Sequence, residues 1–288
     1  MIAIYKRELK SYFTSMIGWV FMAAVLVFLG LYFYVYNMYY GYPYYAYAMS
    51  GTQFIFMLAI PILTMRSFAE ERHSKTDQLL LTAPVSVAQI VLGKFLAMVT
   101  VFGLDMLIVC LCTLIIKSYG NAYLSVDYAS IFLYFLMGSC YIAISMFLSS
   151  LTESQIIAAV VSYAVLILLY LMKSVVAMIP TSATASLVGF AVIVFLVALI
   201  VFIVTKNWFT SFCLLAVGMI AVAVVYMIKP TLYENAIPSL LGNFVLTTGF
   251  TQAVNSSILS LGWVVRYVSV IFFFCFLTAQ TVQKRRWS

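Results

Sequence analysis

The sequence predicts an all-α protein that crosses a membrane many times, and two observations carry this prediction. Of the 288 residues, 66% are hydrophobic and only 8% are charged, whereas soluble domains have about 45–50% and roughly 25%. Apolar runs also recur along the whole chain, each near the ~20 residues that a helix needs to cross a hydrocarbon core of about 30 Å. The composition therefore excludes most soluble enzymes.

Eight apolar runs make up the predicted helical bundle. The first follows a charged start, and no small-residue cleavage site stands behind it, so we expect a retained span rather than a signal peptide. Only Lys206 and Asn207 separate the sixth and seventh runs, which predicts a tight helical hairpin. The second run is the shortest. The predicted spans are 18–36, 52–65, 94–116, 128–149, 155–178, 187–205, 208–228 and 263–282.

The distribution of Lys and Arg predicts the orientation, because these residues stay on the cytoplasmic side of a span. With the N-terminus inside, 11 of the 15 cations lie inside and only Lys117, Lys173, Lys229 and Arg266 lie outside. We therefore expect a cell-membrane protein whose N- and C-termini are both cytoplasmic, in contact with lipids and not with nucleic acid.

Tyrosines crowd the end of the first span and the loop that follows it. Nine of the 21 tyrosines lie between Tyr32 and Tyr47. Tyrosine prefers the headgroup level of a membrane, which favours an interfacial belt. The alternative is an aromatic vestibule that contacts an aromatic or amphiphilic cargo.

Residues 1–16 read as a helix that lies along the inner leaflet. Apolar residues recur at spacings of three and four, and charged residues occupy the other faces. Such a helix could act as an anchor only, or as an elbow that abuts a cytoplasmic partner. The elbow residues of the second interpretation are Tyr5, Arg7 and Glu8.

The segment 66–94 is the most charged part of the chain, with four of the 15 cations and three of the eight carboxylates. We expect the second span to continue as helix through Glu71. A short amphipathic helix then exposes Leu79, Leu80 and Leu81 and ends at Pro84. These leucines either fold back onto the inner leaflet or insert into a groove on a soluble partner.

The run IPILTMRSFAEERHSKTDQLLLTAPVSVAQIVLGKFLA, at 60–97, resembles the signature region of ABC-2 type permeases, the membrane subunits of ATP-driven exporters. The resemblance is closest to the gliding-motility and nitrous-oxide-reductase-maturation branch. KRELKSYFTS near the N-terminus, FLSSLTESQIIAAVVSYAVL around Glu153 and VSVIFFFCFLTAQTVQKRRW near the C-terminus are similar to that branch too.

The resemblance implies a type V exporter-like bundle whose loop after the second span docks on an ATPase. By position this coupling element maps to about 67–84. The implied coupling residues are Ser67, Glu70, Glu71, Arg72, Asp77, Leu79, Leu80, Leu81 and Pro84.

The sequence departs from the branch in two places. The branch has glycine where Lys75 stands, and leucine and glutamate near Asp77 and Gln78. The family pattern also has six spans, so the hairpin 187–228 reads as an addition that packs on the periphery or recruits a further membrane or extracellular subunit.

The chain lacks a phosphate-binding GxxxxGK[ST] loop, so we expect no ATPase activity of its own. The resemblance implies a separate ATP-binding subunit in two copies, which holds ATP and Mg²⁺, and a second permease copy or a paralogue. For this chain itself we expect no cofactor, metal or catalytic residue.

Asp105 is the one carboxylate in the middle of a span, about 11 residues or roughly 16 Å beyond Lys94. A charge at that depth costs at least about 2.5 kcal/mol, so the side chain should face protein or water. It either lines the transport path or makes an interhelical hydrogen bond. An intramembrane aspartyl protease is disfavoured, since no second span carries an Asp or Glu near its middle. An intramembrane serine protease is disfavoured because its base would have to be His73, which lies in the cytoplasmic loop.

The leading hypothesis is thus an export permease, and a non-transporting membrane anchor for the same ATPase is the alternative. An ion-coupled transporter would need intramembrane charge pairs and repeated halves, whereas the sequence has one intramembrane Asp and no evident inverted repeat.

The outer segment 229–262 is expected to contain short helices and to act as a lid over the exit or only as a connection. The predicted divisions are 1–16, 17–178 with the loop 66–94, 187–228, 229–262, 263–283 and 284–288.

Overall fold

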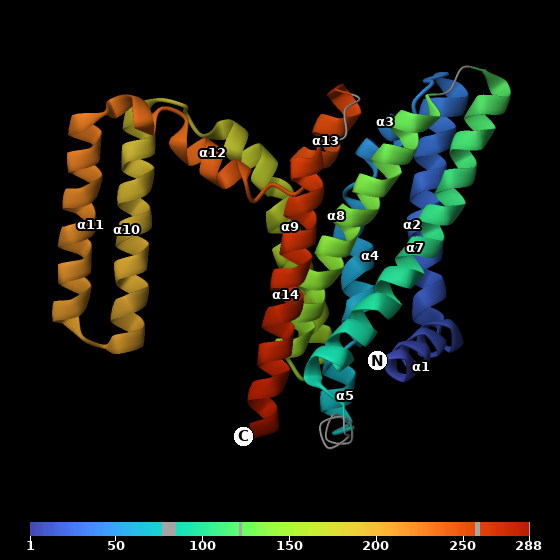
Figure 1. The fold of residues 1–288 in the computed structure, drawn as a ribbon, viewed down its shortest axis with the longest axis horizontal. Coiled ribbons are helices and arrows are strands. Elements are labelled where there is room, and N and C mark those ends of the chain that lie inside the picture. The colour runs from blue at the N-terminus through green and yellow to red at the C-terminus, as the bar shows by residue number, and fades with distance from the viewer. Residues whose placement is uncertain (77–84, 121–122, 257–259, 288) are drawn as a thin grey trace. The chain divides into compact units, whose positions relative to one another are not determined.

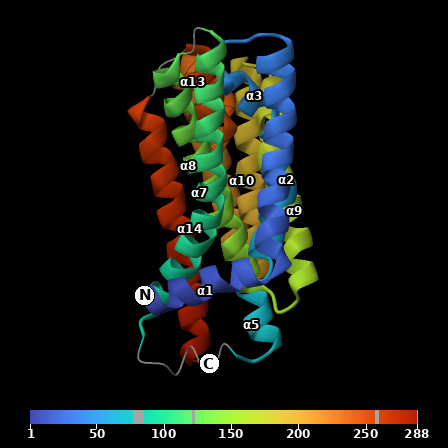
Figure 2. The same cartoon turned by 90° about the vertical axis from the view of Figure 1, so that its right-hand side faces the viewer.

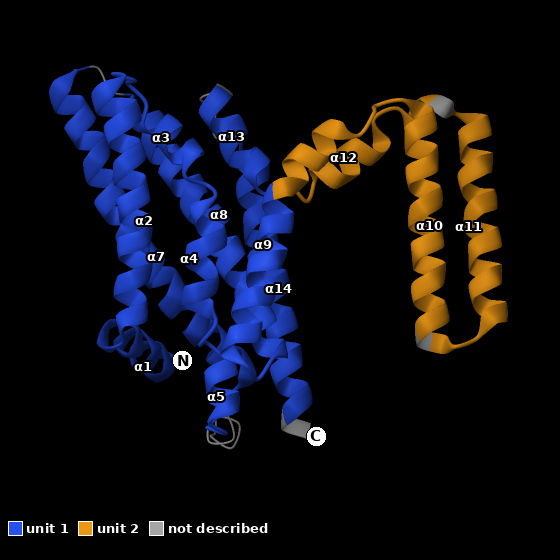
Figure 3. Cartoon of the chain, turned by 180° about the vertical axis from the view of Figure 1, so that it is seen from behind, with its two compact units in different colours: residues 1–170, 246–288 blue, residues 171–245 orange. Residues whose placement is uncertain are grey.

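The computed structural model describes residues 1–288 except 77–84, 121–122, 257–259 and 288 (Figure 1). Helices are the only regular structure in the described residues, which confirms the all-α fold. The chain divides into unit 1, residues 1–170 and 246–288, and unit 2, residues 171–245 (Figure 3).

Unit 1 surrounds one long central helix, α8, which packs against α14, α7, α4, α13 and α3 (Figures 1 and 2). Its core is apolar and includes several fully buried aromatic rings. The elements that belong wholly to this unit are α1 (Ile2–Thr14), α2 (Met16–Phe33), the π-helix η1 (Tyr34–Tyr39), α3 (Tyr45–Gly51), α4 (Ile55–Thr64), α5 (Ala69–His73), α7 (Val87–Tyr119), α8 (Leu124–Leu151), α13 (Thr247–Ser256) and α14 (Leu261–Trp287).

Unit 2 contains a hairpin of α10 (Ala183–Thr205) and α11 (Trp208–Ile228), followed by η2 (Pro230–Tyr233) and α12 (Ala236–Gly242). The helix α9 (Gln155–Met178) begins in unit 1 and ends in unit 2. Lys206 makes the hairpin turn in the left-handed conformation, and Asn207 Oδ1 then accepts a hydrogen bond of 3.0 Å from Phe209 N. The two residues between the predicted spans thus form the turn and the N-cap.

Seven helices in the described residues are long and apolar enough to cross a membrane. An eighth crossing results if α3 and the stretch 55–73, which meet at 71°, count as one span. The ten residues of α4 would reach only about 15 Å, half of a hydrocarbon core. The second predicted span, 52–65, thus consists of a turn at 52–54 followed by the short helix α4, and it is not a full straight crossing.

Two predicted boundaries were wrong. Helix α7 begins at Val87 instead of Lys94, because Ser86 caps it by accepting a hydrogen bond from Gln89 N at 3.4 Å. Lys94 therefore lies about two turns inside the helix. The helix expected to run from the second span through Glu71 stops at Thr64, turns, and resumes as α5.

The tyrosine-rich segment was expected to form the end of a span and a loop, but it contains two helices. The first span ends in η1, and α3 then turns into the core, where Tyr45 is fully buried. Asn37 holds the intervening loop, since its Nδ2 donates to the carbonyl oxygens of Tyr42 and Tyr44 at 2.8 and 3.0 Å.

Candidate functional site

Three elements meet at one end of unit 1: the N-terminal helix α1, the corner between α4 and α5, and the first turns of α7 (Figures 1 and 2). Lys94 lies where they meet, and its side chain is only 2% exposed. It shares the face of α7 that buries Ile90, Val91, Ala97 and Met98. A buried lysine needs partners, because desolvating an unpaired ammonium is costly.

The Lys94 ammonium has such partners on both neighbouring elements. Its Nζ donates to the Ser67 carbonyl oxygen at 2.7 Å and to Glu8 Oε1 at 3.2 Å. It also lies 3.0 Å from Glu71 Oε1 and 5.2 Å from the centre of the Phe68 ring. One cation therefore contacts α1, the α4–α5 corner and α5 at the same time.

Arg7 closes these contacts into a ring. Its Nη2 donates to Glu8 Oε1 and, at 2.8 Å, to Glu71 Oε1, the same two oxygens that Lys94 contacts. Charges alternate around Arg7, Glu8, Lys94 and Glu71, and they sum to zero. We call these four residues the charge ring. A neutral, fully paired ring is the arrangement that makes burial of Lys94 tolerable.

The surroundings favour the cationic form of the arginines here. Partial burial lowers the pKa of Arg7, but the Glu8 and Glu71 carboxylates outweigh it, so that the pKa is raised. The Glu70 carboxylate raises the pKa of Arg66, which it pairs with through both oxygens. Both guanidinium groups stay charged at neutral pH.

Helix α1 is fixed to unit 1 by further contacts. Tyr5 OH and Thr100 Oγ1 are 3.1 Å apart, and Tyr12 OH donates to the Leu63 carbonyl oxygen at 3.3 Å. The corner into α2 is tight, because a Cβ on Gly18 would lie 2.5 Å from the Tyr12 carbonyl oxygen. The N-terminal helix thus packs on both α7 and α4 in this structure.

Hydroxyl groups on one face of α8 hold the α4–α5 corner from the other side. Ser145 Oγ lies 2.6 Å from Thr64 Oγ1, and Ser149 Oγ donates to the Met65 carbonyl oxygen at 3.2 Å. Ser149 Oγ also accepts from Phe68 N at 3.4 Å. The corner therefore contacts the central helix as well as the charge ring.

The predicted coupling residues fall into three groups. Ser67, Glu71 and Arg72 pack inward: Ser67 and Glu71 meet Lys94, and Arg72 Nη1 donates to the Thr152 carbonyl oxygen at 3.4 Å. Glu70 pairs with Arg66 on the surface. The remaining predicted residues, Asp77, Leu79, Leu80, Leu81 and Pro84, lie outside the described residues.

Of the predicted elbow residues, Tyr5 and Glu8 contact α7 and Arg7 contacts α5, and the structure brings Arg7 and Glu8 into the charge ring. Lys94 is the residue that sequence reasoning missed, since it counted there only as a cytoplasmic cation. A signal was present: a lysine on the apolar stripe of a helix, flanked at i−4, i−3, i+3 and i+4 by residues that are buried here.

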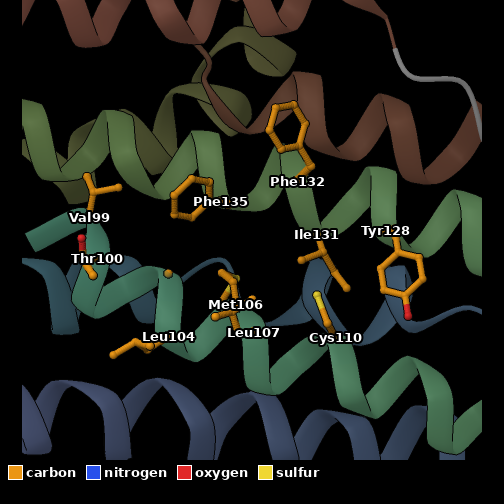
Figure 4. Close-up of a pocket in the computed structure, with 11 residues that line it drawn as sticks. Val99, Thr100, Leu104, Met106, Leu107, Cys110, Tyr128, Ile131, Phe132 and Phe135 are labelled. Atoms are coloured by element: carbon orange, nitrogen blue, oxygen red, sulfur yellow. The ribbon is translucent and has the colours of Figure 1, made fainter. Parts of the chain in front are cut away.

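Asp105 lies deeper on α7 and is fully buried. In the described residues neither of its carboxyl oxygens has a hydrogen-bond partner. Its two neighbours in sequence, Leu104 and Met106, contribute to the wall of an apolar groove of about 470 Å³ between α7 and α8, whereas Asp105 does not (Figure 4). The carboxyl group therefore points away from that groove.

The groove itself offers little chemistry. Among the side chains that line it, Thr100 and Tyr128 carry the only oxygen atoms (Figure 4), and Thr100 Oγ1 donates to the Leu96 carbonyl oxygen. In the described residues no three His, Cys, Asp or Glu side chains gather in a way that could hold a metal ion. The polar contacts around Lys94 therefore come from the charge ring and from the serine hydroxyl groups on α8.

Comparison with known proteins identifies the family. Residues 40–197, from the tyrosine-rich segment to the middle of α10, match the family described as ABC-2 family transporter protein. The search of curated proteins and the search of solved structures returned no match. The family match spans more than half of the 288 residues and includes the α4–α5 corner and Lys94. The chain is a multi-pass membrane permease subunit and belongs to the ABC-2 transporter family.

Proposed function

We propose that this permease subunit works in an ATP-driven exporter, where a separate ATP-binding subunit docks on the segment 67–84 and on the N-terminal helix α1. The observation that carries the proposal is the charge ring. It joins α1, α5 and α7 at the end of unit 1 where the sequence places the docking residues.

The contacts suggest how a motor could act on the spans. A push on α5 reaches α7 directly, because Lys94 holds both Glu71 and the carbonyl oxygen of Ser67. It reaches α8 through Ser149, which contacts the same corner. Closure of two ATP-binding subunits would thus move two adjacent spans and α1 together and open the cargo path outward.

The proposal includes the topology. The end with α1 and α5 carries Lys6, Arg7, Lys10, Arg66 and Arg72, and Lys and Arg are retained on the cytoplasmic side. We therefore place this end in the cytoplasm of the cell membrane, and we propose that the path forms between two permease copies or with a paralogue.

The test uses the chain co-expressed with its ATP-binding subunit. Replacing Leu79, Leu80 and Leu81 by Asp should abolish co-purification of that subunit. Lys94→Met should leave co-purification intact, because the docking surface remains. It should remove the stimulation of ATP hydrolysis, because α7 then loses its contacts with Ser67 and Glu71. Arg285→Met, which breaks an exposed pair with Glu153, is the matched control.

Two results would count against the proposal. The first is normal binding and normal stimulation in the triple Asp variant, which would remove 79–81 from the docking surface. The second is an equal effect of Lys94→Met and Arg285→Met, which would remove the charge ring from coupling. A complex whose ATP hydrolysis never moves cargo across reconstituted vesicles would instead support the non-transporting anchor.

A further inference from the structure

The side of α1 that faces away from the other helices carries two lysines without a counter-charge. Lys6 and Lys10 are both exposed, and in the described residues neither side chain makes an ion pair. The opposite side of α1 packs inward through Ile4 and Tyr12. Glu8, the one carboxylate of this helix, belongs to the charge ring. The exposed side of α1 therefore carries two positive charges that no described residue neutralises.

The spacing of these two lysines makes the unpaired state unfavourable. Residues four apart lie side by side on a helix, with about 5–6 Å between their Cβ atoms, and like charges at this spacing destabilise the helix. An anion between the two ammonium groups offsets the repulsion. Arg7 does not compete for such an anion, because its guanidinium already pairs with Glu8 and Glu71. The pattern therefore indicates an external anion that contacts Lys6 and Lys10 together.

The corner between α1 and α2 places the lysines at the level of lipid headgroups. Helix α1 lies across unit 1 at the end where the candidate span α2 begins (Figures 1 and 2). Trp19, in the first turn of α2, is 57% exposed. Its Nε1 donates to the Phe13 carbonyl oxygen at 3.0 Å, and its ring packs edge-on against that of Phe13. Tryptophan prefers the headgroup level, and Lys10 precedes Phe13 by only about one helical turn.

Apolar side chains beside the lysines favour a lipid over a soluble anion. Ile2, one turn before Lys6, is 69% exposed, and Met16, at the start of α2, is 83% exposed. Basic residues next to exposed apolar residues are typical of helices that lie in a membrane interface and bind anionic lipids through both. A zwitterionic headgroup has no net charge to neutralise the lysines, whereas that of phosphatidylglycerol carries one negative charge.

We propose that α1 binds the headgroup of an anionic phospholipid, whose phosphate lies between the ammonium groups of Lys6 and Lys10 while its acyl chains pack beside Phe13 and Trp19. A lysine near an anionic membrane surface strengthens binding about fivefold. We therefore expect a preference of about five- to thirtyfold over a zwitterionic lipid, the range for one or two lysines. The binding needs neither ATP nor the ATP-binding subunit, so its failure would leave the proposed function untouched.

The experiment reconstitutes the purified chain in vesicles and follows the quenching of Trp19 fluorescence by brominated acyl chains. One set of vesicles contains brominated phosphatidylglycerol in unbrominated phosphatidylcholine, and the other set reverses the label. The Trp19 signal is the difference between each chain and its Trp19→Phe variant, which removes the contribution of the other three tryptophans. At equal mole fraction, brominated phosphatidylglycerol should quench Trp19 more strongly. About 1 M salt should weaken the preference, because the Debye length falls to about 3 Å.

Two double substitutions provide the matched pair. Lys6→Gln with Lys10→Gln should abolish the preference, whereas Lys173→Gln with Lys206→Gln removes the same charge from exposed lysines outside α1 and should not change it. Lys6→Arg with Lys10→Arg keeps the charge and should keep the preference. Equal quenching by both lipids in the unmodified chain, or an equal loss in the two Gln variants, would overturn the proposal. A preference that about 1 M salt leaves unchanged in the unmodified chain would overturn it too, and this measurement needs no variant of the lysines.

Discussion

The Nζ atom of Lys94 lies 2.7 Å from the carbonyl oxygen of Ser67, and this contact joins α7 to the corner between α4 and α5. Twenty-seven residues separate the two in sequence. Ser67 lies in the turn between α4, which ends at Thr64, and α5, which begins at Ala69, so its carbonyl oxygen belongs to neither helix. The same ammonium also pairs with Glu8 and Glu71, and Arg7 supplies the second positive charge of the ring.

Lys94→Met should destabilise unit 1 by about 3 kcal/mol, at the lower end of the cost of breaking a buried ion pair. The two glutamates keep some exposure, 12% and 17% of their side chains, which limits the cost. Their Oε1 atoms would share Arg7 alone. The measurement is the unfolding midpoint in mixed micelles. Arg285→Met, at an exposed pair, should change stability by less than about 1 kcal/mol. Equal losses would contradict the burial argument.

Lys75→Gly should stabilise α5 by about 1 kcal/mol. Lys75 has a φ of 56°, the left-handed conformation that a Cβ disfavours. Its N–H bonds the Arg72 carbonyl oxygen and Thr76 N–H bonds that of Glu71, at 3.1 and 2.9 Å, which is the Schellman pattern with its usual glycine position. The unfolding midpoint should rise for Lys75→Gly and not for Lys75→Ala, which keeps a Cβ. A rise in both would trace the effect to the lost charge.

Gly138→Ala should cost about 1–3 kcal/mol, as overpacked cores do. A Cβ on Gly138 would overlap the Phe102 ring, which is fully buried among the rings of Phe21, Phe56 and Phe135 and has no room to move. The facing helix α7 offers the control: a Cβ on Gly103 would meet Phe135 at an ordinary 3.6 Å. Gly103→Ala should therefore be neutral or stabilising by about 0.5–1 kcal/mol, and a loss there would contradict this packing.

Asp105→Leu should raise stability by about 1 kcal/mol, because it removes a buried polar group that has no hydrogen-bond partner in the described residues. Asp127 is equally buried, but its Oδ1 accepts from Ala46 N at 3.3 Å, so Asp127→Leu should be destabilising. Unfolding midpoints compare the two. Coupled ATP hydrolysis in the complex is the second measurement. If Asp105→Leu is stable and fully coupled, Asp105 does not line the path.

Hydropathy predicted the number and order of the spans well, because the thickness of a bilayer fixes their length. It failed at the second span, where α4 has only ten residues and a crossing results only if α3 and the stretch 55–73 count as one bent span. The pattern also missed the burial of Tyr45. A tyrosine-rich sequence is typical of the membrane interface, and the sequence alone does not show which of its tyrosines are buried. Tyr45 is buried because α3 packs against α8.

The candidate site was only half predictable. The charge of 66–94 and the amphipathic pattern of 1–16 indicated two separate cytoplasmic elements. That Glu8 and Glu71 meet on one lysine depends on contacts across 86 and 23 positions, and no local spacing encodes them. The coupling residues 77–84 remain a prediction, as they lie outside the described residues.

Helix α7 runs without a break for 33 residues. Lys94, near one end, and Tyr119, at the other, are therefore about 38 Å apart when measured along the helix. If the motor tilts α7 at the charge ring, as the proposed function requires, the displacement would pass along the same continuous helix towards its far end at Tyr119. The close packing of Phe102 of α7 against Gly138 of α8 lies between these two ends, so movement of α7 there would also act on the central helix α8.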